Sequence, residues 1–347
     1  MILNSFIFLE GNTPIEYSAE ELCDIFESKK NTHFIYDNIR EAQIIPNLRD
    51  GLDSFDISLE KSNSKFTILL AGDEKPEYFL NRKNINIIYN HGHFARLIYT
   101  QTKRRNELSN YQQIKQNFTN FILYLNCKPY DYRCKLMDEV QNTNLLESSK
   151  WSWLINRENY DWKHWNQEIK TIENDILEKT NYDNHVGFNP LRQDFIESNT
   201  NCFIQLISES VPYYFFLTEK TVKPLLHGQL FLVAGSVNFH KKLKNLGFKL
   251  YDEIIDYSFD SLISYDDRVK GIINNLENLK NLNWNETYKK LEEKIKFNQQ
   301  HLYDFAFDKE YNLELFNLIE KYQSSFDELK LDEKKYIFTK ELFYEIQ

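Results

Sequence analysis

The stretch CFIQLISESVPYYFFLTEKTVKPLLHGQLFLVA, residues 202–234, decides the fold class of this chain. It opens with a largely apolar run, 202–207, interrupted only by Gln205, which is typical of a central strand buried on both faces. Residues 218–228 have the character of a helix, with Thr218 at the N-cap position. A second apolar run, 230–234, ends at Gly235 and Ser236. A strand, a helix and a strand in succession predict an α/β protein.

The same alternation continues outward through most of the chain. The remaining expected strands are 4–9, 33–36, 65–71, 86–89 and 118–125, and the remaining expected helices are 19–28, 133–140 and 237–245. Gly247 is placed to end the last of these helices, because glycine readily adopts the left-handed conformation found there. Beyond Asp267 the pattern is helical and ends in 334–346. The alternation predicts two α/β domains facing each other, followed by a helical tail.

The domain boundaries follow from changes in composition. We expect an N-terminal α/β domain of residues 1–117, a C-terminal α/β domain of residues 118–330 and a terminal helix of residues 331–347. The crossing is placed in 103–117, which is polar and poor in strand-forming residues. Residues 150–200 are rich in Trp, Asn and charge, and this composition indicates an insertion.

Composition excludes several classes of protein. The chain has 347 residues, of which 41% are hydrophobic, and only 9 Gly and 7 Pro. These values exclude a disordered, collagen-like or low-complexity chain. The net charge of −10 argues against a basic nucleic-acid-binding surface over the whole protein, although a local basic groove stays possible.

Several features also bear on the compartment. The sequence predicts no signal peptide and no membrane span, because no apolar run is long enough and no cleavage pattern follows the first one. Apart from the Cys127 and Cys134 pair, the four cysteines are widely spaced, and we expect free thiols in a reducing compartment at Cys23, Cys127, Cys134 and Cys202. These features favour a cytoplasmic protein.

The densest group of chemically capable residues lies in the opening stretch. Ser208, Glu209 and Ser210 follow the carboxyl end of a buried strand, where open α/β sheets bind ligands. Thr218, Glu219, Lys220 and Lys223 then open a helix, whose unpaired N–H groups and dipole favour an anion. The two lysines are three residues apart and share one helical face. A phosphate group fits this pattern, and the plain alternative is a capped helix with a solvated first turn.

This pattern resembles the donor-binding motif of GT-B glycosyltransferases. Ser208-Glu209-Ser210 followed by Thr218-Glu219-Lys220 is most similar to the α1,3-fucosyltransferase family, whose motif reads roughly F-E-N-S, a short gap, then T-E-K. Asn126 at a strand end and Arg133 downstream resemble the opening of that family's nucleotide-binding domain. The resemblance covers about residues 118–260, and Ser210 replaces the family's Asn. A looser similarity to phage and bacterial glycosyltransferase-like proteins leaves the sugar open.

The resemblance implies two Rossmann-like domains facing a central cleft, and inverting transfer of a sugar from a nucleotide-diphosphate sugar to an acceptor hydroxyl. It implies donor contacts at Asn126, Arg133, Glu209, Ser210, Thr218, Glu219, Lys220 and Lys223. Upstream, Gly72-Asp73-Glu74-Lys75-Pro76 is similar to the family's G-E-N-x-x-P turn, whose Glu is proposed as the catalytic base. Asp73 or Glu74 would take that role here, and ordinary turn chemistry is the alternative.

The nucleotide sugar would be a co-substrate, and we expect no cofactor. No D-x-D pair occurs in the sequence, so we also expect no metal ion at the diphosphate. The His91-Gly92-His93 pair is more typical of an acceptor-site or structural role than of a metal site. Within the aromatic run 213–216, one ring could stack on the nucleotide base.

The acceptor stays open at this stage. A glycan or lipid-linked saccharide is the family expectation, and a hydroxymethylated pyrimidine in phage or viral DNA is the alternative. A protein that binds nucleotide sugars without turnover is a third possibility. A glycoside hydrolase is disfavoured, because it needs two carboxylates at the scissile bond and no phosphate site.

Overall fold

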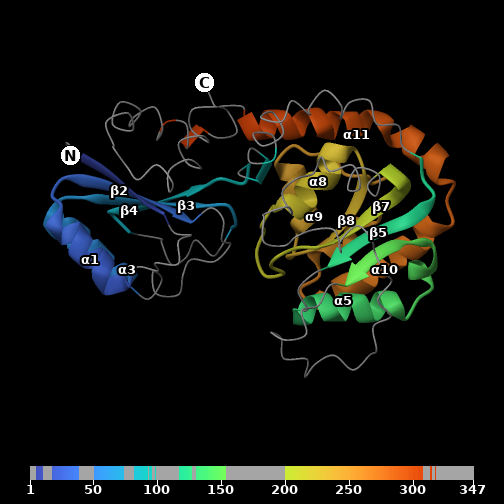
Figure 1. Ribbon diagram of the computed structural model, residues 1–347, viewed down its shortest axis with the longest axis horizontal. Coiled ribbons are helices and arrows are strands. Elements are labelled where there is room, and N and C mark those ends of the chain that lie inside the picture. Colours follow the sequence, from blue (N-terminus) through green and yellow to red (C-terminus); the bar gives the residue numbers. More distant parts are fainter. Residues whose placement is uncertain are drawn as a thin grey trace. The chain divides into compact units, whose positions relative to one another are not determined.

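The computed structural model describes residues 5–10, 18–38, 51–73, 82–92, 94, 95, 98, 117–126, 130–153, 200–307, 313, 314 and 317. The chain divides into two compact units (Figure 1). Unit 1 comprises Met1–Arg96 with Phe305–Gln347, and unit 2 comprises Leu97–Asp304. Of the predicted domain crossing, 103–117, only residue 117 is described. The predicted terminal helix, 331–347, lies outside the described residues.

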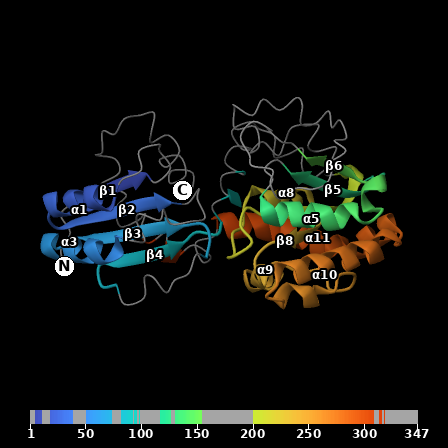
Figure 2. The same cartoon turned by 90° about the horizontal axis from the view of Figure 1, so that it is seen from below.

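Unit 1 contains a parallel sheet in the order β1-β2-β3-β4, which is also the chain order. Its strands are β1 (Ser5–Glu10), β2 (Thr32–Asn38), β3 (Lys65–Leu70) and β4 (Ile85–Tyr89). Figure 2 shows that helices α1 (Ala19–Ser28) and α3 (Leu52–Ser62) lie side by side against this sheet. The structure confirms the predicted strands of this unit and the helix at 19–28.

The core of unit 1 is aromatic. The ring of Phe26 on α1 lies 4.7 Å from that of Phe34 on β2 and 5.1 Å from that of Phe66 on β3, measured between centroids. Phe55 on α3 completes the cluster, and all four side chains are fully buried. Burying rings of this size supplies most of the free energy that holds helices on a sheet.

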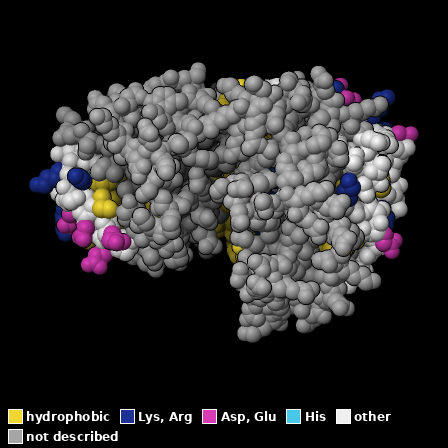
Figure 3. All heavy atoms as spheres, in the orientation of Figure 1, with side chains coloured by type: hydrophobic (Ala, Val, Ile, Leu, Met, Phe, Trp, Pro, Cys, Tyr) yellow, Lys and Arg dark blue, Asp and Glu magenta, His cyan; other side chains and the backbone are white. Residues whose placement is uncertain are grey.

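The charged surface of unit 1 is separate from its core. On the face that Figure 3 shows, acidic and basic side chains of unit 1 lie together over α1 and α3, and other acidic side chains lie on unit 2. Neither helix contains a residue expected to bind the donor.

Unit 2 contains a second parallel sheet, in the order β6-β5-β7-β8. Its strands are β5 (Asn120–Asn126), β6 (Lys150–Trp153), β7 (Cys202–Ser208) and β8 (Leu230–Ala234). Every residue of β7 and β8 is buried, as their apolar runs predicted. The interpretation of residues 150–200 as an insertion is wrong for Lys150–Trp153, because these residues form the edge strand β6, which pairs with β5. Residues 154–199 lie outside the described residues.

Helices cover both faces of the second sheet. Helices α5 (Asp131–Gln141) and α10 (Tyr265–Lys280) lie on one face, and α8 (Glu219–His227) and α11 (Trp284–Phe307) lie on the other (Figure 1). Trp284 of α11 stacks on Phe121 of β5 and Phe203 of β7 with centroid separations of 5.5 and 6.0 Å.

The short helix α9 (Phe239–Asn245) follows β8. Gly247 adopts φ +97° directly beyond it, which confirms the predicted glycine end of this helix. His240 of α9 accepts a hydrogen bond at Nε2 from the Val233 amide of β8 (3.2 Å), and its Nδ1 lies 2.8 Å from Oδ1 of Asp260. With Nε2 as the acceptor, the imidazole is held as the neutral Nδ1–H tautomer, which donates to Asp260.

The remaining sequence expectations concern thiols and membranes. Cys23, Cys134 and Cys202 are free, and burial raises the pKa of the Cys134 and Cys202 thiols to about 12. Cys127 lies outside the described residues. Across the ranges described above, no helix combines the length and apolar character of a membrane-spanning segment.

Candidate functional site

The candidate site lies where the strand order of unit 2 reverses. From β5 the chain adds β6 on one side and then returns to add β7 on the other. In open parallel sheets, such a reversal leaves a crevice at the carboxyl ends of the two central strands. Asn126 ends β5 and Ser208 ends β7, so both stand at this position. Both residues are buried, with 6% and 3% of their surface exposed.

Glu209, the residue after β7, organises the loop that follows. Its buried carboxylate accepts four hydrogen bonds from the protein. The donors are Ser210 N (2.9 Å), Thr218 N (3.2 Å), Thr218 Oγ1 (2.7 Å) and Thr221 Oγ1 (2.7 Å). These bonds compensate the carboxylate for the loss of water, and they fix the loop to the first turn of α8.

Helix α8 begins as the sequence predicts, at N-cap Thr218. The Thr218 hydroxyl accepts a hydrogen bond from Lys220 N at 3.3 Å. Lys220 then reaches back across the loop, because its Nζ lies 2.6 Å from Ser210 Oγ and 3.5 Å from Oε1 of Glu219. An ammonium group and a helix N-terminus therefore lie at the same end of β7, and both favour an anion.

Lys223 stands one turn deeper in α8 and is 7% exposed. Burial lowers the pKa of its ammonium group to about 8, with Lys220 adding to this effect and Glu219 opposing it. Burial acts to raise the pKa of Glu219, but Lys220 and Lys223 outweigh it and the pKa is lowered. The helix start is thus a small charged cluster of Lys220, Lys223 and Glu219, and the Glu209 carboxylate lies beside it on Thr218 and Thr221. An additional anion would help to hold Lys223 in its charged form.

The first turn of α5 joins the same site from β5. The Tyr132 hydroxyl donates a hydrogen bond to the Ser210 carbonyl at 2.6 Å. Arg133 is 5% exposed, and its guanidinium carbon lies 5.0 Å from the centroid of the Tyr130 ring and 5.7 Å from that of Tyr132. The aromatic rings hold a guanidinium group beside the loop that Lys220 contacts.

Asp73, the candidate base, belongs to unit 1 and follows the end of β3. Its Oδ1 lies 3.1 Å from Nε2 of His91, a residue placed just after β4. The other ring nitrogen of His91 lies 3.2 Å from the Ala71 carbonyl oxygen, which can only accept. The His91 ring also stacks on Tyr89, with centroids 5.9 Å apart. The imidazole is thereby held in a fixed orientation toward Asp73.

The structure places the sequence-predicted residues in two groups. Glu209, Ser210, Thr218, Glu219 and Lys220 form one connected set at the carboxyl edge of unit 2. Asn126, Arg133 and Lys223 stand on elements that meet this edge. Glu74 and His93 lie outside the described residues.

Sequence reasoning missed three participants, Tyr132, Thr221 and His91 as the partner of Asp73. The only sequence signal for Tyr132 was its position beside Arg133 in the first turn of a helix. Among the residues that the structure describes, no three or more His, Cys, Asp or Glu side chains come together in a way that could hold a metal ion.

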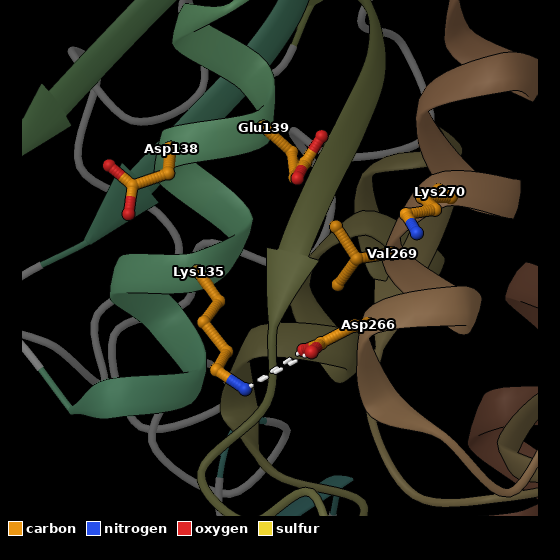
Figure 4. A pocket seen from close by; sticks show the side chains of 6 residues that line it. All are labelled: Lys135, Asp138, Glu139, Asp266, Val269 and Lys270. Atoms are coloured by element: carbon orange, nitrogen blue, oxygen red, sulfur yellow. Dashed lines mark hydrogen bonds and ion pairs between the residues drawn. The ribbon is translucent and has the colours of Figure 1, made fainter.

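A separate hollow of about 220 Å³ lies between α5 and α10 (Figure 4). It is lined by Lys135, Asp138, Glu139, Asp266, Val269 and Lys270. Figure 4 shows Lys135 directed toward Asp266, and the Lys135 Nζ to Asp266 Oδ1 distance is 2.9 Å. Carboxylates outnumber ammonium groups here, so this hollow is unsuited to a phosphate group. None of the sequence-predicted site residues lines it.

Comparison of the chain with protein-family models, curated proteins and solved structures finds no significant match to any of them.

Proposed function

We propose that this protein is an inverting glycosyltransferase of the GT-B type, which moves a sugar from a nucleotide-diphosphate sugar to an acceptor hydroxyl. The observation that carries the proposal is the start of α8. There, Lys220, Lys223 and the helix N-terminus meet a loop fixed by Glu209, at the point where the strand order reverses. The resemblance of this loop and helix to the α1,3-fucosyltransferase motif supports the same conclusion.

The proposed chemistry assigns the leaving diphosphate to unit 2. Negative charge grows on the diphosphate as the glycosidic bond breaks, and fixed positive groups stabilise that charge. Lys220 and Lys223 supply ammonium groups, and Arg133 supplies a planar guanidinium that matches phosphate oxygens. Asn126 offers a polar group at the end of β5, and Ser210 offers one in the loop after β7. Glu219, whose side chain is 21% exposed, would accept hydrogen bonds from ribose hydroxyls.

Within this proposal, Glu209 is a positioning residue. Its two carboxylate oxygens already accept four hydrogen bonds from the protein. It therefore acts on the donor through Ser210 and Thr218, whose places in the loop it fixes.

The buried Ser236 hydroxyl, which follows β8, makes no hydrogen bond to another residue of the described chain. It is a further polar group at this edge of the sheet.

Unit 1 would activate the acceptor. Asp73 is the proposed general base, and His91 orients its carboxylate. A positioned carboxylate that removes the acceptor proton accelerates such a reaction by roughly 10²–10⁴-fold. A glycan or lipid-linked saccharide is the preferred acceptor.

Nucleotide binding and donor turnover test this proposal. Wild-type protein is titrated with GDP, UDP, CDP and dTDP, and thermal stability is measured, because a ligand that binds the folded state raises it. Lys220→Ala should weaken binding of the preferred nucleotide at least tenfold. Lys270→Ala, which removes an exposed lysine from α10, is the matched control and should bind as wild type does.

Turnover separates the remaining alternatives. Release of nucleoside diphosphate that depends on an added saccharide acceptor supports the proposal, whereas the absence of nucleotide binding contradicts it. Nucleotide binding without any release would indicate a binding protein. Release that depends on hydroxymethylated DNA, with salt-sensitive duplex binding, would instead identify a DNA glycosyltransferase.

A further inference from the structure

The loop between β7 and α8 carries one exposed ring on an otherwise anchored backbone. Tyr213 is 81% exposed, whereas Phe215 and Phe216 are 1% and 4% exposed. The Phe215 ring packs on Phe239 of α9, with centroids 4.9 Å apart. The run of four aromatic residues, 213–216, is therefore divided between core and surface. Packing in the core accounts for Phe215 and Phe216 but not for the exposed ring of Tyr213.

Both ends of this loop are fixed, which restricts where the Tyr213 ring can go. Glu209 holds the first end through Ser210 N and the second end through Thr218. Tyr132 holds Ser210 a second time through its carbonyl group. Pro212 directly precedes the exposed ring and is buried, and its φ is restricted by the pyrrolidine ring. An exposed aromatic side chain on so constrained a backbone loses little entropy when it binds a flat ligand.

Tyr213 also stands close in the chain to the proposed phosphate-binding groups. Three residues before it, Ser210 accepts the hydrogen bond from Lys220 at 2.6 Å. The second anchored end of the loop is Thr218, the N-cap of α8. A ligand bound at this helix start therefore lies beside the loop that carries the ring.

Two more exposed apolar side chains stand just before helices of the same unit. Ile263, which is 89% exposed, lies just before α10, and Tyr130, which is 40% exposed, lies just before α5. The Arg268 guanidinium ties this segment to the end of β8. It donates hydrogen bonds to the carbonyl of Ile263 (2.8 Å) and to that of Gly235 (3.3 Å). Unit 2 thus carries charged and polar groups at the start of α8 and exposed apolar side chains at the starts of α5 and α10, and a ligand that joins a diphosphate to a flat ring needs both kinds of group.

We infer that Tyr213 is the stacking platform for the base of a nucleoside diphosphate bound at the start of α8. The inference rests on the proposed function and deepens it, because it assigns the nucleoside part of the donor to a particular side chain. Stacking tolerates any base, since every base has a π face. Tyr213 would therefore contribute affinity for the nucleoside, and other groups would select among the bases.

Two ligands and three variants test the inference. Calorimetric titrations measure the affinity of wild type, Tyr213→Ala, Tyr213→Phe and Tyr303→Ala for the preferred nucleoside diphosphate and for inorganic pyrophosphate. Tyr303 is 48% exposed on α11 and serves as the matched control. We expect Tyr213→Ala to weaken binding of the nucleoside diphosphate by about 5- to 100-fold. Its affinity for pyrophosphate should stay unchanged, and Tyr213→Phe and Tyr303→Ala should bind as wild type does.

The outcomes distinguish this inference from the function on which it rests. A wild-type protein that binds neither ligand overturns both. A wild-type protein that binds the nucleoside diphosphate with an affinity that Tyr213→Ala leaves unchanged overturns only the stacking role. Equal weakening of both ligands also overturns it, because a stacked base cannot affect pyrophosphate. Circular dichroism of each variant confirms that the fold is retained before the titrations are compared.

Discussion

Thr218 donates two hydrogen bonds to the buried carboxylate of Glu209, one from its backbone nitrogen at 3.2 Å and one from its hydroxyl at 2.7 Å. The same hydroxyl accepts the hydrogen bond that caps α8. A single pair of residues therefore connects the end of a central strand to the start of the helix proposed to bind a diphosphate. The geometry of that proposed site depends on a residue that we do not expect to touch the ligand.

Glu209→Gln should destabilise the protein. The amide replaces one acceptor oxygen by a donor that faces hydroxyl and N–H donors, so hydrogen bonds to a charged group are lost. We expect the free energy of unfolding to fall by about 1.5–3 kcal/mol, measured by urea denaturation. Glu277→Gln, at an exposed position of α10, is the control and should change stability little. Equal stability of the two variants would contradict the role given to Glu209.

Lys223 should make stability depend on pH in the alkaline range. Its pKa is about 8 in the folded protein because burial disfavours its charge, and an ordinary lysine in the unfolded chain has a pKa of about 10.4. Between these values the unfolded chain binds more protons, so this residue's contribution to the free energy of unfolding rises with pH. From pH 7.5 to 9.5, wild type should gain about 2 kcal/mol relative to Lys223→Met.

Urea denaturation at several pH values measures that difference. Lys270→Met removes an exposed lysine and should follow the wild-type curve. Parallel curves for wild type and Lys223→Met would show that Lys223 keeps an ordinary pKa. Because Glu219 and Lys220 face Lys223, the titrations include Glu219→Gln. This variant should lower the pKa of Lys223 further, since Glu219 is the neighbour that raises it.

Asp73→Asn should reduce turnover while leaving nucleotide affinity nearly intact, because the amide cannot remove the acceptor proton. The expected loss in kcat is roughly 10²–10⁴-fold. Glu74→Gln tests the neighbouring carboxylate in the same assay, and full activity in both variants would refute the assignment of the base to this turn. His91→Gln should give a smaller loss, on the order of tenfold, because it changes only the orientation of Asp73.

Removal of divalent metal ions should leave the activity unchanged. The prediction rests on the lack of a D-x-D pair in the sequence and on the cationic groups proposed to bind the diphosphate. Donor turnover is measured with and without EDTA at constant ionic strength. Activity that is lost with EDTA and restored by Mn²⁺ would contradict the prediction.

The local chemistry of the sequence was sufficient to predict α8 and its flanking strands. Thr218 begins the helix and Gly228, with φ +65°, ends it, because both act through bonds within a few residues. The apolar runs of β7 and β8 likewise identify strands that are buried on both faces. Elements with a weaker local signal were missed. In α3, Leu52, Phe55 and Leu59 form a buried helical stripe between polar residues, and β6 has only four residues.

The sequence by itself determined the α/β class and the candidate residues at the strand ends, because periodicity and capping are local properties of the chain. Tertiary structure decided what those residues do. The hydrogen bonds from Thr218 and Thr221 to Glu209 span nine and twelve residues, and the Tyr132 bond to Ser210 spans 78. Tertiary structure also separated the buried Phe215 from the exposed Tyr213. Contacts of this range depend on how strands and helices pack, and a sequence pattern does not record them.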